Sequence, residues 1–213
     1  MLEWLEEYAD VFDVAIGLAT VFVWIFYAQL LLSNFRRQRR PKLVINQGLG
    51  TELDSRCLLS NMSQEAIHIE NIFGTVETER GRFTAPITDF KPPVSEEGPV
   101  GLGQGTLQGP VKSGNYMDIG TFRDVIKTIG RYRRLPMAED ENCLDFDAIS
   151  VTSIEIVAIA IYGPEDDPIA ASRVFRLLDG EQGVRLKPSD VNTQQMVSRR
   201  SRKTVKHWLK EQR

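Results

Sequence analysis

The chain has 213 residues, which suits one ordinary domain with additional segments at its ends. Apolar residues make up 42% and charged residues 26% of the sequence, values that exclude a largely disordered, collagen-like or multi-span protein. The net charge of −3 argues against a general nucleic-acid binder, and two cysteines without a Cys-x-x-Cys pair exclude a disulfide scaffold.

The charged residues are segregated along the chain. Residues 1–13 carry five acids and no base, whereas residues 33–42 carry five bases and no acid. Residues 199–213 carry seven bases and one acid, which leaves 14 bases and 23 acids for the body of the chain, residues 43–198. Such asymmetry indicates a membrane or a charged partner rather than a uniformly solvated surface.

Residues 14–32 form an uncharged, apolar stretch that predicts a transmembrane helix. As a helix, these 19 residues would measure about 28 Å, close to the thickness of the hydrocarbon core of a bilayer. A cleaved signal peptide would need a basic start, but residues 1–13 are acidic. A buried core helix is the other alternative, and the basic segment 33–42 directly after the stretch favours a membrane stop instead.

The basic segment 33–42 also predicts the orientation of the span. Cytoplasmic flanks are enriched in Lys and Arg, and all the flanking bases lie on the C-terminal side. We therefore expect a single-pass protein of a plasma or inner membrane, with residues 1–13 outside and residues 41–213 in the cytoplasm. The side chains expected at the anionic lipid headgroups are Arg36, Arg37, Arg39, Arg40, Lys42 and Trp208.

Small residues within the span suggest a contact between two helices. Ala15 and Ala19 form a small-xxx-small pair, and Gly17 lies between them in the sequence. Pairs of this kind let helices pack closely, although Ala and Gly are common in membrane spans. Ala15, Gly17 and Ala19 are thus the candidate residues for self-association.

Residues 43–187 predict a mainly β, sandwich-like cytoplasmic domain, because short β-branched runs alternate with breaks rich in Gly, Asn and Ser. The longest run, 151–162, is apolar on both faces apart from Glu155, which is typical of a central buried strand. Residues 82–85 are expected to pair back on the strand before them. The predicted strands are 42–46, 56–60, 66–78, 82–85, 116–120, 151–162 and 169–178.

A short helix is predicted at 121–129, where apolar residues recur at helical spacing and Gly130 follows. Residues 91–114 are rich in Gly and Pro, which predicts a long surface loop. The side chains expected on the apolar face of the helix are Phe122, Val125, Ile126 and Ile129.

The C-terminal segment, 188–213, is predicted to form a basic amphipathic helix with Ser189 as its N-cap. Its bases accompany a thin apolar stripe. Three contacts are open for this helix: the β-domain itself, the cytoplasmic leaflet of the membrane, or an acidic partner. The residues of the stripe are Val197, Val205, Trp208 and Leu209.

No motif in the sequence specifies catalysis, a cofactor or a metal. The glycine run 101–105 lacks the flanking strand, the helix and the third glycine of a dinucleotide-binding motif. His68 and His207 have no cysteine near them in sequence, so neither a zinc site nor a triad is predicted, and His68 is expected on the solvent face of a strand. The acids between 139 and 147 do not follow the calcium-loop pattern. We therefore predict no catalytic, cofactor-binding or metal-binding residues.

These features predict a non-catalytic function: a membrane-tethered binding or scaffolding module, acting as an accessory subunit of a membrane-associated complex. The expected partners are the lipid bilayer, anionic lipid headgroups, and either a protein partner or a second copy of the chain. Two alternatives stay open. One is a self-associating membrane effector or signalling protein whose sandwich senses a ligand. The other is an enzyme with a site assembled from scattered residues.

Overall fold

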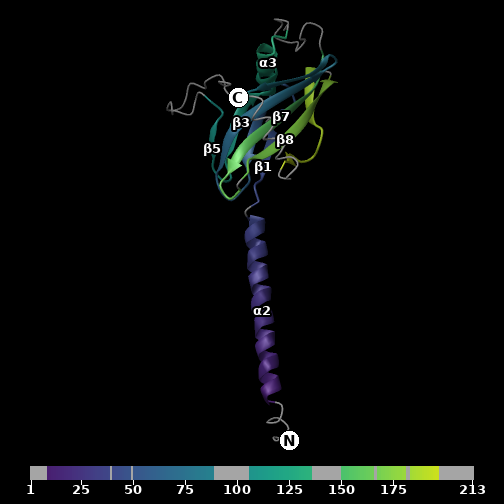
Figure 1. The fold of residues 1–213 in the computed structure, drawn as a ribbon. Coiled ribbons are helices and arrows are strands. Elements are labelled where there is room, and N and C mark those ends of the chain that lie inside the picture. Colours follow the sequence, from purple (N-terminus) through teal and green to yellow (C-terminus); the bar gives the residue numbers. More distant parts are fainter. Residues whose placement is uncertain are drawn as a thin grey trace. The chain divides into compact units, whose positions relative to one another are not determined.

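A computed structural model divides the chain into two compact units, Met1–Arg40 and Pro41–Arg213. Among its described residues the first contains one helix, and the second contains the β-domain; Figure 1 shows these elements. The structure describes residues 9–38, 40–48, 50–88, 106–135, 150–165, 167–180 and 183–196. The glycine run 101–105, the acids between 139 and 147, and His207 lie outside these residues.

The first unit contains the helix α2, Ala9–Gln38, which includes the predicted span 14–32. Its segment Asp10–Asn34 is long and apolar enough to cross a membrane, and its described side chains are exposed. The helix forms because no Pro or charge interrupts the apolar stretch. The Thr20 hydroxyl is satisfied within the helix, since it donates to the carbonyl of Ile16 at 2.8 Å.

The β-domain contains two antiparallel sheets. The smaller sheet has the strand order β1-β2-β6, and a bulge interrupts the β2–β6 register after Cys57. The three strands are β1 (Leu43–Gln47), β2 (Arg56–Asn61) and β6 (Tyr116–Thr121).

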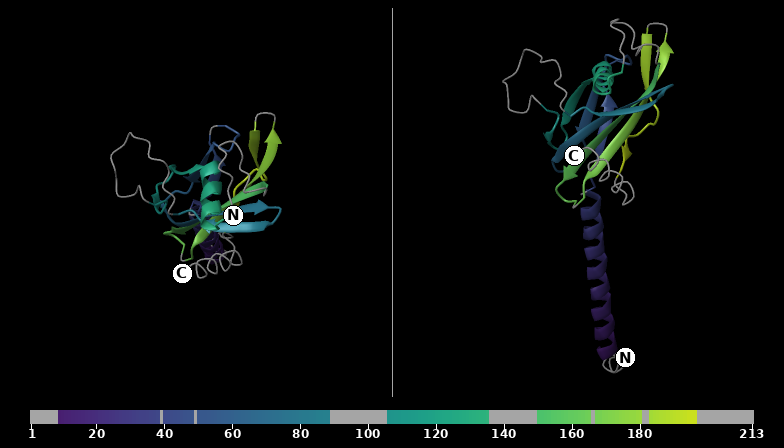
Figure 2. Two further views of the ribbon diagram at one scale, coloured as in Figure 1. Left: turned by 90° about the horizontal axis from the view of Figure 1, so that it is seen from above. Right: turned by 45° about the horizontal axis from the view of Figure 1, so that its top comes forward.

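The larger sheet has seven strands in the order β10-β8-β7-β3-β4, with β5 paired to β3 and β9 paired to β8. The long strands β3, β7 and β8 lie side by side in each view (Figures 1 and 2). The strands are β3 (Ile67–Thr78), β4 (Gly81–Pro86), β5 (Gly109–Val111), β7 (Val151–Tyr162), β8 (Ile169–Gly180), β9 (Gly183–Pro188) and β10 (Gln194–Gln195).

Strand β7 is central and buried on both faces, as its sequence predicts. One face carries Ile154, Ile156 and Ala158, which belong to the main hydrophobic core. The opposite face carries Val157 and Ile159, which belong to a second, smaller cluster. Because side chains alternate along a strand, a run that is apolar at every position buries both faces of the sheet.

The main core takes side chains from both sheets and from the helix α3. Leu43 and Leu59 contribute from the smaller sheet, and Phe175 contributes from the larger one. Phe122 of α3 lies edge-on to Phe175, with 4.7 Å between the ring centroids. The mainly β fold is therefore confirmed, while the sandwich arrangement stays a prediction.

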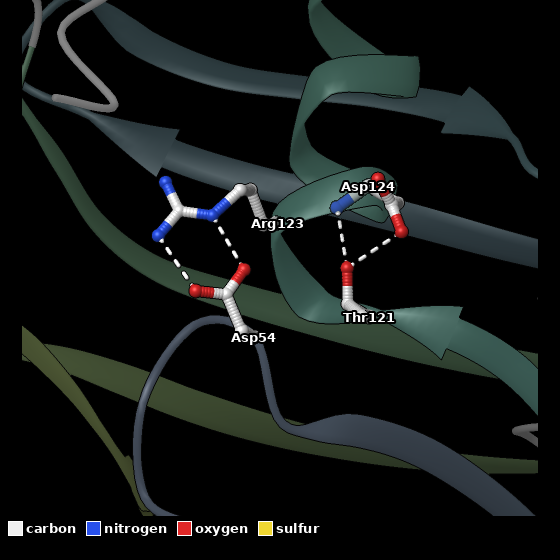
Figure 3. A network of polar contacts seen from close by, with 4 residues as sticks. All are labelled: Asp54, Thr121, Arg123 and Asp124. Carbon is white, nitrogen blue, oxygen red and sulfur yellow. Dashed lines mark hydrogen bonds and ion pairs between the residues drawn. The ribbon is translucent and has the colours of Figure 1, made fainter. Parts of the chain in front are cut away.

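Helix α3, Phe122–Tyr132, begins one residue after the predicted start, because Thr121 is its N-cap. The Thr121 hydroxyl accepts a hydrogen bond from the backbone N–H of Asp124 at 3.1 Å and donates to the Asp124 carboxylate at 2.7 Å (Figure 3). This cap satisfies one of the free N–H groups at the start of the helix. The helix continues through Gly130, so the predicted end at Ile129 is three residues too early.

An ion pair joins the start of α3 to the loop before β2. Arg123 donates from Nε to Asp54 Oδ1 at 2.6 Å and from Nη2 to Asp54 Oδ2 at 3.0 Å (Figure 3). The hydrogen bond from Arg123 is the main reason that the pKa of Asp54 lies below its usual value. The bidentate geometry fixes the loop against the first turn of the helix.

Helix α3 packs closely on β3 because Gly74 carries no side chain. A Cβ atom built at Gly74 would lie 2.7 Å from Ile129 Cδ1 and 3.3 Å from Val125 Cγ1. The four apolar positions predicted for this helix are all fully buried. Glycine at position 74 thus sets the distance between the helix and the sheet.

Two predictions are wrong within the described residues: the helix from Ser189 and the end of the loop 91–114. No helix begins at Ser189, because Gln194 and Gln195 pair with β8 as β10. The backbone N–H of Met196 donates to the carbonyl of Ala170 at 2.7 Å, so this segment is bonded to the sheet. The rest of the predicted helix, from residue 197 onward, lies outside the described residues.

The predicted loop 91–114 is also more ordered at its end than expected. Gly109–Val111 forms β5 and pairs with β3, and Leu107 is buried in the core. A three-residue strand that contains Pro110 has too short a pattern to be recognised in sequence. Residues 91–105 lie outside the part of the chain that the structure describes.

Candidate functional site

A shallow, polar pocket lies on the larger sheet, where β3, β7 and β8 are neighbours. Its volume is about 430 Å³. Glu77, Ser153 and Arg176 occupy one row across the three strands, because Glu77 pairs with Ser153 and Ser153 pairs with Arg176. The residues lining the pocket are Glu77, Thr152, Ser153, Val174, Arg176, Ser189 and Asp190.

Two hydroxyl groups of the pocket hold Glu77 in place. Ser153 donates to Glu77 Oε2 at 3.0 Å, and Thr152 donates to the backbone carbonyl of Glu77 at 3.1 Å. The backbone N–H of Ser189 donates to the carbonyl of Val174 at 2.9 Å, which brings the segment after β9 to the rim. The pocket thus offers two carboxylates, a guanidinium and three hydroxyls, an array suited to binding a polar group.

A small apolar cluster lies farther along the same face of the sheet. Side chains alternate along β7, so Val157 and Ile159 are on the same face as Ser153. Phe73 and Ala170 flank them on the neighbouring strands. The partly buried Met196 packs against this group, which we call the outer cluster: Phe73, Val157, Ile159 and Ala170.

Polar pairs separate the pocket from the outer cluster. Arg82 of β4 forms an ion pair with Glu155 of β7 at 2.8 Å. The hydroxyl groups of Thr75 and Thr84 lie 2.9 Å apart on β3 and β4. The sequence indicated Glu155 as the one acid within an apolar strand, and the structure shows its partner.

Side chains of the segment after β9 cover the free edge of β1. The backbone N–H of Ile45 donates to Thr193 Oγ1 at 2.9 Å, and that of Leu43 donates to Gln195 Oε1 at 3.2 Å. The Gln195 amide in turn donates to the carbonyl of Leu43. These bonds satisfy edge groups that would otherwise be open to pairing with another chain.

Arg173 strengthens the same edge. Its Nη1 donates to the carbonyl of Ile45 at 2.7 Å, and its Nη2 donates to the carbonyl of Val191 at 3.1 Å. Burial lowers the pKa of Arg173, but an arginine stays protonated in proteins. We call Arg173, Thr193 and Gln195 the edge latch, because together they join residues 189–196 to β1.

Two bases of the segment 33–42 have described side chains, and their position at lipid headgroups stays a prediction. Arg40 and Lys42 both have exposed side chains. The backbone of Lys42 is bonded to the domain, since its N–H donates to Ser63 Oγ at 2.8 Å and its carbonyl accepts from Met62. Arg36 and Arg37 fall within α2, but their side chains are not described. Arg39 and Trp208 lie outside the described residues.

The three residues predicted for helix–helix contact are exposed on α2. Ala15 and Ala19 are one helical turn apart and share a face, whereas Gly17 is displaced by two positions and lies on another. No atom lies within 4 Å of a Cβ built at Gly17. Their role in self-association stays a prediction.

The remaining titratable candidates do not come together. His68 is exposed on β3, as predicted. Cys57 is fully buried, and burial raises the pKa of its thiol well above the usual value, so the thiol stays protonated at neutral pH. Within the ranges that the structure describes, no group of three His, Cys, Asp or Glu side chains is placed to hold a metal ion.

Sequence reasoning did not find the polar pocket or the edge latch. Each depends on which strands become neighbours: β3, β7 and β8 for the pocket, and β1 and β8 for the latch. The alternation of Ser153 and Glu155 with apolar residues in β7 was the only signal of a polar region on that face. Comparison of the chain with family models, curated proteins and solved structures found no match.

Proposed function

We propose that this protein is a single-pass membrane protein whose β-domain is a non-catalytic binding module at the cytoplasmic surface of a plasma or inner membrane. The observation that carries the proposal is the length and apolarity of α2. Its segment Asp10–Asn34 is long and apolar enough to cross a membrane. A helix satisfies its own backbone hydrogen bonds, so lipid is an environment that this segment suits.

The length of the segment supports a span. Its 25 residues measure about 38 Å as a helix, compared with about 30 Å for a hydrocarbon core, and a modest tilt accommodates the excess. Ser33, like Thr20, donates its hydroxyl proton to a backbone carbonyl one turn earlier, at 2.7 Å from the oxygen of Gln29. Neither hydroxyl therefore needs water.

The edge latch supports placing both basic segments at one end of the domain. Gln195 is bonded to Leu43, and Leu43 directly follows the basic segment 33–42 in the chain. The basic segment 199–213 begins four residues after Gln195. Twelve bases therefore start from neighbouring points of the domain, which suits attraction to the anionic cytoplasmic leaflet.

A sandwich arrangement of the two sheets is part of the proposal. One hydrophobic cluster takes side chains from both sheets, including Ile45 and Ile156. The edge latch also joins β1 of the smaller sheet to β8 and β10 of the larger one. Two sheets that share one core in this way are typical of a β-sandwich.

The polar pocket is the proposed face for a partner of the accessory-subunit type. Glu77 and Arg176 are exposed and lie on β-strands, so they are preorganised for polar contacts. Tethering the domain to a membrane raises the effective concentration of a weak binding face near other membrane proteins. Arg176 is the one base among the residues that line the pocket.

The experiment is affinity purification of the full-length protein from membranes dissolved in a mild detergent. Arg176→Glu reverses the charge in the pocket, and Lys112→Glu reverses an exposed charge that does not line it. We expect a stoichiometric foreign partner with the wild type and Lys112→Glu, and at least a tenfold loss with Arg176→Glu. A loss of this size follows from the cost in binding free energy of reversing one partner of a charged contact.

Two results would contradict the proposal. Recovery of the wild-type protein as a monomer without a partner would contradict a binding function of the β-domain. Recovery of the protein alone as a discrete oligomer would favour the self-associating effector. In the second case, Ala15→Leu and Ala19→Leu should dissociate the oligomer, because bulky residues prevent close helix contact.

A further inference from the structure

The outer cluster is an apolar surface that few of the described side chains cover. Phe73 and Val157 are 4% exposed, Ala170 is 1% exposed and Ile159 is fully buried. These residues face away from the main core, to which the alternate positions of β7 belong. Among the described side chains, Met196 packs against them. A surface this well buried on the outer side of a sheet requires a larger apolar cover than one methionine.

The chain itself leads onto this surface. β10 pairs with β8 at the sheet edge, and the backbone of Met196 is bonded to that of Ala170 at 2.7 Å. Met196 is the last described residue, and 17 residues follow it. The described part of the chain therefore ends in contact with the outer cluster.

The length of this segment fits the surface. Seventeen residues in a helix measure about 26 Å. The outer cluster spans the three adjacent strands β3, β7 and β8, which is about 10 Å at the usual separation of strands. The segment is thus long enough to cover the cluster and to extend beyond it.

The sequence of 197–213 has the pattern of a helix with one apolar side. At 100° per residue, its four large apolar residues fall within an arc of about 120°. Six of its seven bases fall within an arc of about 100° on the other side. The apolar residues are Val197, Val205, Trp208 and Leu209.

We propose that residues 197–213 of the same chain dock on the outer cluster as a basic amphipathic helix. Trp208, Val205 and Leu209 lie against the sheet, and the basic arc points away from it. The body of the chain, with 23 acids and 14 bases in residues 43–198, favours the approach of this basic segment. The apolar face is therefore an internal docking surface, and it does not depend on the proposed partner of the polar pocket.

The test uses the full-length protein in nanodiscs that contain anionic lipid, with p-benzoylphenylalanine in place of Trp208. After irradiation, we expect a cross-link at the mass of the monomer, mapped to peptides that contain Phe73, Val157 or Ala170. The matched control carries the same photoreactive residue in place of Lys206, at the centre of the basic arc. Its cross-links to these peptides should be at least fivefold weaker.

Other cross-links would overturn the proposal. Products with lipid from position 208 would show that the apolar arc enters the membrane. Products at twice the monomer mass would show docking on a second copy. Equal yields on the outer-cluster peptides from positions 206 and 208 would show that the segment has no preferred face.

A second measurement is independent of cross-linking. Leu209→Glu places a charge in the apolar arc, whereas Lys210→Glu alters the neighbouring residue in the basic arc. We expect Leu209→Glu to lower the Tm of the domain by about 2–6 °C and Lys210→Glu to leave it within about 1 °C. A Tm that is unchanged in both variants would overturn the docking.

Discussion

At the residue scale, the start of α3 depends on a few polar side chains. Thr121 caps the helix, and Arg123 joins its first turn to Asp54 (Figure 3). These contacts lie at the surface of the domain. Each contributes little to the free energy of unfolding, but together they fix the direction of the chain at the start of α3. Two predictions belong to this scale.

Thr121→Ala should lower the free energy of unfolding by about 1 kcal/mol, because it removes the acceptor for the N–H of Asp124. The matched control is Thr128→Ala in the middle of the same helix. Thr128 donates to the carbonyl of Asp124, which already belongs to the helix, and Ala is a good helix former. Chemical denaturation of both variants in detergent should therefore show a loss only for Thr121→Ala.

The ion pair of Asp54 should make a small, pH-dependent contribution to stability. The pKa of Asp54 is lowered in the folded state, so its contribution is complete above the ordinary carboxyl pKa and is lost as the pH falls through the folded-state pKa. The Asp54 side chain is 61% exposed, which limits the effect to less than about 1 kcal/mol. Asp54→Asn should be less stable than the wild type at pH 7, and the difference should shrink toward pH 3.

The contradictory outcome for this pair is a difference between wild type and Asp54→Asn that stays constant or grows as the pH falls. Such a result would show that the amide disturbs packing instead of removing a charge. Arg123→Lys provides a further check, because lysine cannot form the two parallel hydrogen bonds that the guanidinium makes with Asp54.

At the element scale, the fold depends on how closely neighbouring elements approach. α3 contacts β3 at Gly74, and β1 is joined to the segment after β9 by the edge latch. Both contacts connect parts of the chain that are distant in sequence. Each gives a prediction in which another residue of the same type serves as the control.

Gly74→Val should destabilise the domain by about 1–3 kcal/mol, because its side chain would overlap Ile129 and Val125. Gly163→Val is the control, since a Cβ there would meet only Glu65 Oε2, at 3.9 Å. Thermal unfolding of both variants measures the difference. Equal stability of the two variants would mean that α3 can move away from β3 without cost.

Gln195→Ala should cost about 1–2 kcal/mol, because it leaves the N–H and carbonyl of Leu43 without their partner. Gln194→Ala is the control, since Gln194 is exposed and pairs with β8 through its backbone. Hydrogen exchange at the amide of Leu43 should accelerate only in Gln195→Ala. Unchanged exchange there would contradict the role of the latch.

Much of the fold could be predicted from sequence, because its strongest patterns are local. The continuous apolar, β-branched run 151–162 identified the central strand, and the helical spacing of apolar residues in 121–129 identified α3. The helix expected from Ser189 failed because hydrogen bonds to β8 and β1 decide the local structure there, and those partners are distant in sequence. The polar pocket was missed for the same reason, since its row of side chains exists only once three strands are neighbours.

At the scale of the whole molecule, the account depends on α2 crossing a membrane with the β-domain in the cytoplasm. Three features support this arrangement: the apolar exposed segment Asp10–Asn34, the acidic start and the basic segment after it. The edge latch adds that the C-terminal bases start beside the same point of the domain. A soluble role would leave the length and apolarity of this segment unexplained.

The most direct measurement is the labelling of single cysteines in intact cells with a membrane-impermeant maleimide. In a background with Cys57→Ala and Cys143→Ser, one variant carries Glu3→Cys and the other carries Lys112→Cys. We predict that position 3 is labelled in intact cells and that position 112, which is exposed on the domain, is labelled only after permeabilisation. Labelling of position 112 in intact cells, or release of the protein into the soluble fraction, would contradict the account.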